Sequence, residues 1–232
     1  MKRETNAEIE PKDIFEIASK KGCALIELLI YCGLFLLAYL LGSIPFGLVL
    51  STLFSHQDIR RKGSGNIGAT NVLRVAGAKL GLLTLFLDMF KGALPVFMAV
   101  QLMESPESAW SQVVLSLIAI SAFMGHLYPL YLGLRGGGKG VATAWGCFLV
   151  ISPVSALVTL LVFVLMACIS NRASMASLSG SAVLPMVVWL ATHSAVSTLC
   201  ATMIAGLIIL RHKDNILRLL HGTESTIWGK NP

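Results

Sequence analysis

Long apolar blocks constrain this chain more than any other feature of its sequence. Hydrophobic residues make up 55% of the 232 residues and charged residues only 13%, about half the charged share of an ordinary soluble domain. A helix needs roughly 20 apolar residues to cross the hydrocarbon core of a bilayer. Several such crossings would use most of the chain, so the sequence indicates a polytopic membrane protein and argues against a large soluble domain.

Apolar length and polar breaks predict an all-α integral membrane protein with about seven transmembrane helices, some short or broken. The predicted spans are 23–50, 77–103, 109–133, 140–151, 153–169, 173–191 and 194–211. The fourth, at about 12 residues or 18 Å of helix, is too short to cross alone. In an alternative five-span interpretation, 140–169 and 173–211 each form one kinked helix.

The distribution of basic residues among the turns favours the seven-span interpretation. In that interpretation the even-numbered turns, at 104–108 and around 152 and 192, lack Lys and Arg, whereas the other turns are basic. Basic residues gather on the cytoplasmic side of membrane proteins, which predicts an external N-terminus and a cytoplasmic C-terminus. The polar segments 56–76, 133–142 and 211–232 and the turn 170–174 would then share the cytoplasmic side, where we expect one active site.

The chain divides into three predicted regions. Residues 1–22 form a polar N-terminal extension, 23–224 the multi-pass domain and 225–232 a C-terminal tail. Residues 1–21 hold five basic and five acidic residues, so the net charge of +6 arises from the remainder. No run of basic residues forms a stripe, which argues against nucleic-acid binding. The cysteines lack the spacing of zinc ligands, and no metal site is predicted.

The first glycine-rich segment, residues 60–74, suits an anion. Gly63, Gly65 and Gly68 match G-x-G-x-x-G, but no βαβ unit fits between membrane helices, which excludes a dinucleotide fold. Glycines let backbone N–H groups approach an anion closely. The segment also offers the side chains of Ser64, Asn66, Thr70, Asn71 and Arg74. A flexible hydrophilic turn is the alternative.

The second glycine-rich segment ends in a lysine. Residues 133–139 fit G-x-x-x-x-G-K, but Gly140 follows where a nucleotide-binding loop needs Ser or Thr for Mg²⁺, so we exclude ATP hydrolysis. A glycine loop that leads into a helix N-terminus, with Lys139 beside it, still suits a phosphate. In the third segment, His212 and Asn215 share one helix face, although a solvated basic helix end is the alternative.

Two further polar groups lie in or beside predicted spans. Asp88 and Lys91 are three residues apart within the second span, and intramembrane charges usually face a partner or a cavity. A structural ion pair, or a tether for a loop, is as good an interpretation of them as catalysis. His126, near the end of the third span, is interpreted as a hydrogen-bonded residue at the membrane interface.

Taken together, these segments resemble the bacterial acyl-phosphate:glycerol-3-phosphate 1-acyltransferase family over Phe35 to Glu224. Two departures stand out: three glycines, Gly136 to Gly138, precede the lysine where the family usually has two, and residues 1–22 have no counterpart. The resemblance rests on Gly42–Gly47, Gly63–Arg74, Asp88 with Lys91–Gly92, Gly125–His126 with Pro129, Gly137–Thr143, Arg211–His212, Asn215, Arg218–Leu220, Gly222 and Glu224.

The resemblance implies seven membrane helices in the bacterial inner membrane, an active site on the cytoplasmic side, and neither metal nor cofactor. It implies acyl transfer from acyl phosphate to the 1-hydroxyl of sn-glycerol 3-phosphate, with membrane lipid around the protein and no obligatory protein partner. The implied catalytic positions are Ser64, Arg74, Lys139, Ser174, His212 and Asn215. The expected substrate-binding positions are Gly63, Gly65, Asn66, Thr70, Asn71, Gly137, Gly138, Gly140 and Glu224.

Some questions stay open at this level. His212 is a reasonable general base near neutral pH, but a phosphate oxygen of the substrate is an alternative. A transporter of a phosphorylated solute would also explain broken helices and glycine loops, although the polar residues collect on one side. A phosphotransferase needs clustered aspartates for Mg²⁺, and Asp88 is the only aspartate in the predicted spans.

Overall fold

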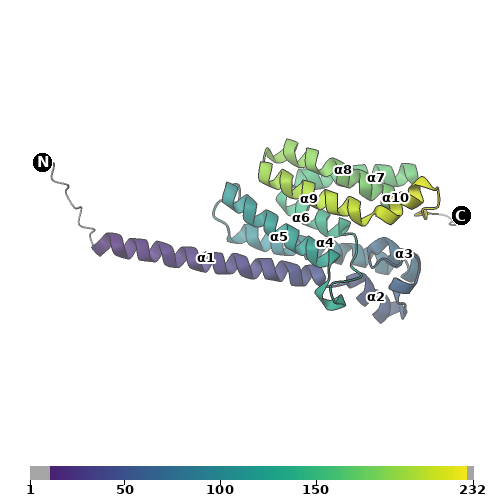
Figure 1. Ribbon diagram of the computed structural model, residues 1–232, viewed down its shortest axis with the longest axis horizontal. Helices are drawn as coiled ribbons and strands as arrows, with labels where there is room; N and C mark the ends of the chain where they lie inside the picture. The colour runs from purple at the N-terminus through teal and green to yellow at the C-terminus, as the bar shows by residue number, and fades with distance from the viewer. Residues whose placement is uncertain (1–10, 229–232) are drawn as a thin grey trace.

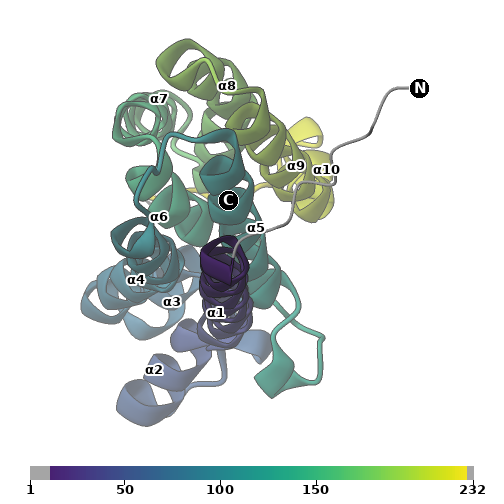
Figure 2. The ribbon, with the colours of Figure 1, turned by 90° about the vertical axis from the view of Figure 1, so that its left-hand side faces the viewer.

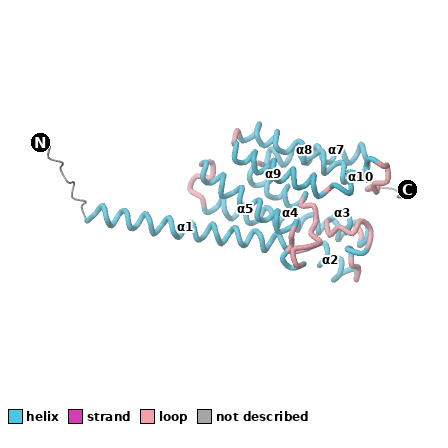
Figure 3. The backbone as a smooth tube through the Cα atoms, in the orientation of Figure 1, coloured by secondary structure: helices cyan, strands magenta, loops and turns pink. Residues whose placement is uncertain are grey.

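The computed structural model describes residues 11–228, with side chains from residue 25 onward. Residues 1–10 of the predicted extension and 229–232 of the predicted tail lie outside this range. Within it the chain forms helices and loops without a β-strand, which confirms the all-α prediction (Figures 1 and 3). The helices are α1 (Pro11–Ser43), α2 (Phe46–Ser55), α3 (Ala69–Ala76), α4 (Ala78–Leu102), α5 (Ala109–Leu127), α6 (Val141–Ile151), α7 (Pro153–Ser170), α8 (Ala173–Thr192), α9 (Ala195–Arg211) and α10 (Lys213–Leu220), with short 3₁₀ turns η1 (Ile59–Arg61) and η2 (Leu130–Leu132).

The number of candidate spans is close to the prediction. Five described helices are long and apolar enough to cross a bilayer, and α9 with α10 makes a sixth if that pair, bent by 58°, is one span. Helix α6 has 11 residues and falls short, as its length in the sequence predicts. The prediction of one continuous helix over 23–50 is wrong, because α1 ends at Ser43 and α2 begins after Pro45. A proline disfavours the helical conformation in the residue before it.

The chain reverses direction where the five-span interpretation required continuous helices. Trp145 Nε1 of α6 donates a hydrogen bond to the carbonyl of Ala156 in α7 at 2.8 Å. In one continuous helix these two residues would lie about 16 Å apart, so the chain turns back at Ser152–Pro153. Helices α8 and α9 also pack side by side. Four separate helices, as in the seven-helix interpretation, occupy this half of the protein.

Glycines allow close packing of α1 on α5 and of α4 on α6. A Cβ atom added at Gly42 would lie 2.1 Å from the carbonyl oxygen of Ala122, and one at Gly92 would lie 2.2 Å from that of Thr143. Backbones of membrane helices approach this closely only where small residues line the interface. These contacts fix α5 relative to α1 and α6 relative to α4.

Gly92→Ala is expected to destabilise the protein by about 1–3 kcal/mol, the usual cost of overpacking a close contact. The added methyl group would meet backbone, which moves less readily than a side chain. Gly206→Ala is the matched control, because a Cβ atom at Gly206 meets nothing within 4 Å. Unfolding of both variants in detergent would measure the difference, and equal stabilities would contradict the packing role.

The polar segments gather at one end of the helix bundle. Figure 1 shows α2, α3 and α10 at the same end, whereas the N-terminal half of α1 projects beyond the bundle in the opposite direction. Figure 2 shows α5 among α1, α4, α6 and α9, all of which it contacts. This arrangement brings the loop after α2, the glycine loop before α6, the α7–α8 turn and the residues after α9 into one region.

Candidate active site

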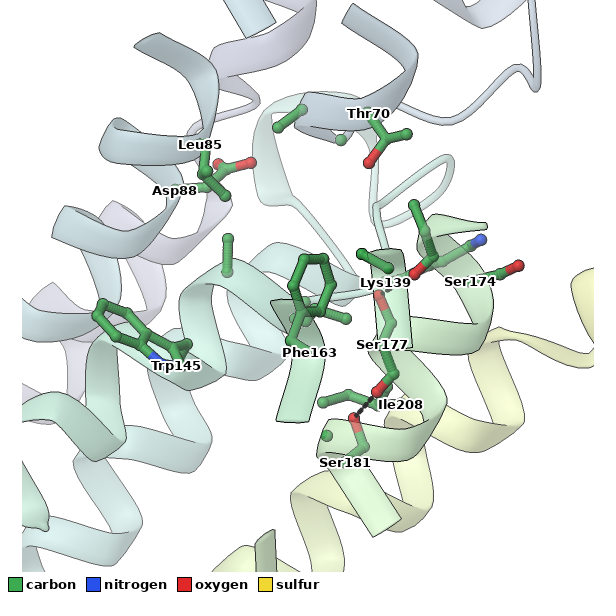
Figure 4. A pocket seen from close by; sticks show the side chains of 18 of the residues that line it. Thr70, Leu85, Asp88, Lys139, Trp145, Phe163, Ser174, Ser177, Ser181 and Ile208 are labelled. Carbon is green, nitrogen blue, oxygen red and sulfur yellow. Dashed lines mark hydrogen bonds between the residues drawn. The ribbon is translucent and has the colours of Figure 1, made fainter. Parts of the chain in front are cut away.

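A cavity of about 690 Å³ opens where these polar segments meet. Its walls come from α4, α6, α7 and α8 and are largely apolar, and its basic residues come from the loops and the helix ends. In Figure 4, Thr70, Lys139 and Ser174 lie toward one end of the cavity, and Trp145 and Ser181 toward the other. A cavity with one polar end and an apolar body suits an amphiphilic molecule.

The fold brings all six predicted catalytic residues to this cavity. Ser64, Arg74, Lys139, Ser174, His212 and Asn215 line it. Of the residues expected to bind substrate, Asn66, Thr70, Asn71, Gly140 and Glu224 also line it. Gly63, Gly65, Gly137 and Gly138 lie outside its lining. Among the described residues, no group of three or more His, Cys, Asp or Glu side chains is placed to hold a metal ion.

A chain of hydrogen bonds fixes the polar end of the cavity. The ammonium of Lys139 donates to Asn215 Oδ1, and Asn215 Nδ2 donates to Glu224 Oε1 at 2.6 Å. The other oxygen of Glu224 accepts from Arg218 Nε at 2.7 Å. Burial, together with the charges of Arg218 and Arg74 and against the opposing effect of Glu224, lowers the pKa of Lys139 to about 8. Lys139 therefore carries a positive charge at neutral pH and titrates just above it.

Glu224 stays ionised although it is buried. Burial alone would raise the pKa of its carboxyl group, but hydrogen bonds from Asn215 and Arg218 outweigh burial and lower the pKa below its ordinary value. The carboxylate would repel a bound anion, and its oxygens are engaged by Asn215 and Arg218. Glu224 is therefore better placed to position Asn215 than to bind an anion directly.

His212 lies at the break between α9 and α10 and is 2% exposed. Its Nδ1 atom is 2.8 Å from the carbonyl oxygen of Ile208. A carbonyl only accepts hydrogen bonds, so Nδ1 carries the proton and Nε2 of the neutral ring keeps its lone pair. The ring is thus held in the tautomer that can accept a proton or a hydrogen bond at Nε2.

Arg74, on α3, contacts the C-terminal segment. Its Nη2 atom donates to the carbonyl oxygens of Ser225 at 3.2 Å and Thr226 at 3.1 Å. Its Nε atom is buried and has no hydrogen-bond partner among the described residues. The guanidinium is therefore anchored through Nη2, while its Nε–H donor is left unpaired by the described part of the chain.

Asn71 organises the first glycine-rich loop. Its Oδ1 atom accepts from the backbone N–H of Ser64 at 2.9 Å. Its Nδ2 atom donates to the carbonyl oxygens of Ile59 at 3.0 Å, Lys62 at 3.1 Å and Asn66 at 2.8 Å. These bonds use both ends of the amide, so Asn71 shapes the loop that presents Ser64. The sequence indicates the presence of this amide but not its partners.

At two of the glycines predicted to bind substrate, the surrounding atoms leave no room for a side chain. At Gly63, where φ is +60°, a Cβ atom would lie 2.3 Å from Asn71 Oδ1, and at Gly138 it would lie 2.1 Å from Nε2 of His126. The N–H of Gly138 donates to the carbonyl of His126 at 3.2 Å, so this amide is not available to an anion. These glycines shape the loops that carry Ser64 and Lys139.

Arg211 holds the second glycine-rich loop, a role that the sequence analysis did not assign to it although Arg211–His212 was one of the motifs behind the resemblance. Its Nη2 atom donates to the carbonyl oxygens of Gly137 at 2.9 Å and Gly138 at 3.2 Å, and its guanidinium lies 5.7 Å from the ring centre of Tyr128. Arg211 thereby joins the glycine loop that precedes Lys139 to the helix end that carries His212. The sequence placed Arg211 beside His212 but did not indicate these carbonyl partners.

Asp88 and Lys91 form a buried ion pair, in which Lys91 Nζ lies 2.9 Å from Asp88 Oδ1. Lys91 Nζ also donates to the carbonyl oxygen of Ile44 at 2.8 Å, in the break between α1 and α2. The pair therefore acts as a tether for that break, one of the alternatives left open by the sequence. His126 Nδ1 lies 3.3 Å from Thr143 Oγ1, so His126 is hydrogen-bonded, as interpreted.

Comparisons with known proteins place this architecture in a family. A family model described as "Glycerol-3-phosphate acyltransferase" matches residues 32–222. Curated proteins of that name include one from Syntrophotalea carbinolica, 46% identical over 82% of this chain and 94% of the relative. Another, from Trichlorobacter lovleyi, is 44% identical over 83% of this chain and 96% of the relative.

Solved structures that resemble this fold come from the same family as the sequence relatives. A crystal structure of PlsY, an integral membrane glycerol 3-phosphate acyltransferase, in its glycerol 3-phosphate form is 39% identical, covers 86% of this chain and 96% of its own, and superposes with a TM-score of 0.79. The lysophosphatidic acid form gives 38% identity and a TM-score of 0.76, with 84% of this chain and 94% of its own covered. On sequence and on fold, this chain belongs to the glycerol-3-phosphate acyltransferase family.

Proposed function

We propose that this protein transfers a fatty acyl group from acyl phosphate to the 1-hydroxyl of sn-glycerol 3-phosphate, with lysophosphatidate and inorganic phosphate as products. The observation that carries the proposal is a cavity that joins a cationic polar end to an apolar groove. Both substrates carry phosphate, and the donor also carries a long apolar chain. A related PlsY has been crystallised in glycerol 3-phosphate and lysophosphatidic acid forms, which supports the same substrate class here.

Three cavity residues are proposed to hold the phosphate of the acceptor: Arg74, Lys139 and Ser174. Charge-assisted hydrogen bonds are worth roughly 1.5–3 kcal/mol each, so a few of them suffice for a small polar substrate. His212 and Asn215 would lie near the reacting hydroxyl. Ser64 and the amides of the first glycine-rich loop would lie near the acyl phosphate.

The acyl chain is proposed to reach the groove sideways from the bilayer. Leu82 of α4 and Leu160 of α7 line the cavity and are also exposed, by 62% and 40%. A cavity whose lining is continuous with the lipid-facing surface lets an apolar chain enter without crossing water. The basic residues at the polar end support a cytoplasmic location for the head groups, with the N-terminus outside, in the bacterial inner membrane.

The reaction needs no covalent enzyme intermediate, because the mixed anhydride of the donor is already activated. The acceptor oxygen forms a bond to the acyl carbon, the bond from that carbon to the phosphate oxygen breaks, and phosphate leaves with the electron pair. The hydroxyl proton passes either to His212 Nε2 or to a phosphate oxygen. Correct positioning alone can contribute roughly 7–11 kcal/mol of rate acceleration.

Phosphate release from long-chain acyl phosphate tests the proposal. The purified protein in detergent would be given the donor with and without glycerol 3-phosphate, in the absence of added metal, and lysophosphatidate would be identified by mass spectrometry. Acceptor-dependent release with lysophosphatidate formation is expected. Release without acceptor would indicate a hydrolase, and absence of release would favour a transporter, which uptake of glycerol 3-phosphate into proteoliposomes would detect.

The KM for glycerol 3-phosphate is expected to rise by about eightfold between pH 7.5 and pH 9, because Lys139, whose pKa lies at about 8, must be protonated to bind an anion. Below the pKa the ammonium is charged and the KM is low, and deprotonation above it removes the charge. In Lys139→Arg the profile should be flat over this range, since arginine stays protonated. Steady-state kinetics over the pH series would check this, and a wild-type KM independent of pH would contradict it.

A further inference from the structure

The C-terminal strap, residues 224–228, crosses the polar end of the cavity between two distant elements. At one side, Arg74 of α3 holds the carbonyl oxygens of Ser225 and Thr226. At the other side, Asn171, in the turn between α7 and α8, holds Ile227 and Trp228. The strap thus links the guanidinium of Arg74 to the α7–α8 turn.

Asn171 binds the strap through three hydrogen bonds. Its carbonyl oxygen accepts from the N–H of Ile227 at 2.8 Å. Its side-chain Oδ1 accepts from the N–H of Trp228 at 2.9 Å, and its Nδ2 donates to the carbonyl oxygen of Trp228 at 2.9 Å. All three bonds engage the backbone of the strap, so they depend on Asn171 and not on the side chains of Ile227 or Trp228.

The backbone at Asn171 suits this role. Asn171 ends α7 with φ at +53°, in the left-handed region that glycine and asparagine tolerate best among the residues. Its own N–H donates to the carbonyl of Ala167 at 2.9 Å. A glycine at this position would keep the helix end and the carbonyl bond to Ile227, and would remove only the two side-chain bonds to Trp228.

We infer that Asn171 is a positioning residue for the phosphate of the acceptor, acting through the C-terminal strap on Arg74. This inference rests on the proposed function, in which Arg74 binds that phosphate. A long arginine side chain loses rotamer freedom when it binds a ligand, and a side chain that is already ordered loses less. The strap orders the Nη2 edge of Arg74 before the substrate arrives, and Asn171 orders the strap.

The two side-chain bonds of Asn171 are tested by Asn171→Gly. The KM and the Kd for glycerol 3-phosphate are expected to rise about tenfold, equivalent to 1.4 kcal/mol of binding free energy, with kcat changed less than twofold. Asn171→Asp keeps the acceptor for the Trp228 N–H and should have a smaller effect. The matched control is His193→Gly, which places glycine at the opposite end of α8 in the same left-handed conformation, φ +48°, and should leave both constants unchanged.

A double-mutant cycle separates positioning from a general structural effect. The Arg74→Lys variant cannot make the same paired contacts with the strap. When Asn171→Gly is added to that variant, the Kd should rise by less than a further factor of two, because the effects of coupled residues are not additive. Equal factors in both backgrounds, or an unchanged Kd in Asn171→Gly, would overturn the inference. The Kd is measured by thermal stabilisation with glycerol 3-phosphate, which does not depend on acyl transfer. The inference is therefore decided even if the wild type transfers no acyl group. That lack of transfer would overturn only the proposed reaction.

Discussion

Lys139→Met is expected to lower kcat/KM for glycerol 3-phosphate by about a hundredfold. A charged hydrogen bond contributes roughly 1.5–3 kcal/mol, and each 1.4 kcal/mol corresponds to about a tenfold change. Methionine keeps most of the length and volume of the side chain, so the packing around it changes little. The variant also leaves Asn215 Oδ1 without the ammonium that it accepts from, which adds to the loss of order at the polar end.

The exposed lysine beside His212 provides the control for Lys139→Met. Lys213→Met removes one positive charge from the same end of the molecule, so it reports the general effect of lowering the local potential, and we expect less than a threefold change. Steady-state phosphate release would measure both variants. A loss of less than tenfold in Lys139→Met would contradict its assignment to the acceptor phosphate and would leave Arg74 and Arg218 as the cations to test.

The gathering of the polar segments could be predicted from the sequence because a membrane restricts topology. Alternate turns of a polytopic protein lie on the same side, so basic turns far apart in sequence are expected to meet. Lys139 and Asn215 are 76 positions apart and contact each other. The short α6 was also predictable, because the length of an apolar block limits the length of the helix.

Contacts to the backbone were not predictable, because a carbonyl group carries no signature in the sequence. Arg211 contacts the carbonyl oxygens of Gly137 and Gly138, and Asn71 bonds three carbonyls of its loop. In the sequence, Arg211 is one more basic residue at a helix end. Asn171 is likewise an ordinary turn residue there, although it holds the strap.

A glycine in a loop can have either of two structural reasons, and the sequence alone does not distinguish them. The absence of a Cβ atom exposes backbone N–H groups to an anion, and it also lets another chain segment approach. At Gly138 the second reason applies, because the ring of His126 occupies the space of a side chain. The loop predicted to form a glycine cradle borders the cavity through Lys139 and Gly140, and the charge there comes from side chains of that loop and its neighbours.

His212→Asn is expected to lower kcat by about a hundredfold or more, the usual contribution of a positioned acid–base group, with little change in the KM for glycerol 3-phosphate. Asparagine can still donate to the carbonyl oxygen of Ile208, so the helix break keeps its shape, but it lacks the basic Nε2 atom. His221→Asn is the control, because His221 is exposed and makes the same hydrogen bond to the residue four positions earlier, at 2.8 Å to Leu217. It should leave kcat unchanged.

The pH dependence of the residual kcat separates the two routes for the proton. If His212 Nε2 accepts the hydroxyl proton, the variant loses the inflection that the imidazole gives the wild-type profile, and its rate follows hydroxide concentration. If a phosphate oxygen accepts it, the variant keeps the wild-type profile at a lower rate, because His212 then only orients the hydroxyl. A variant with wild-type kcat would contradict both roles, since the lone pair of Nε2 is what either role uses.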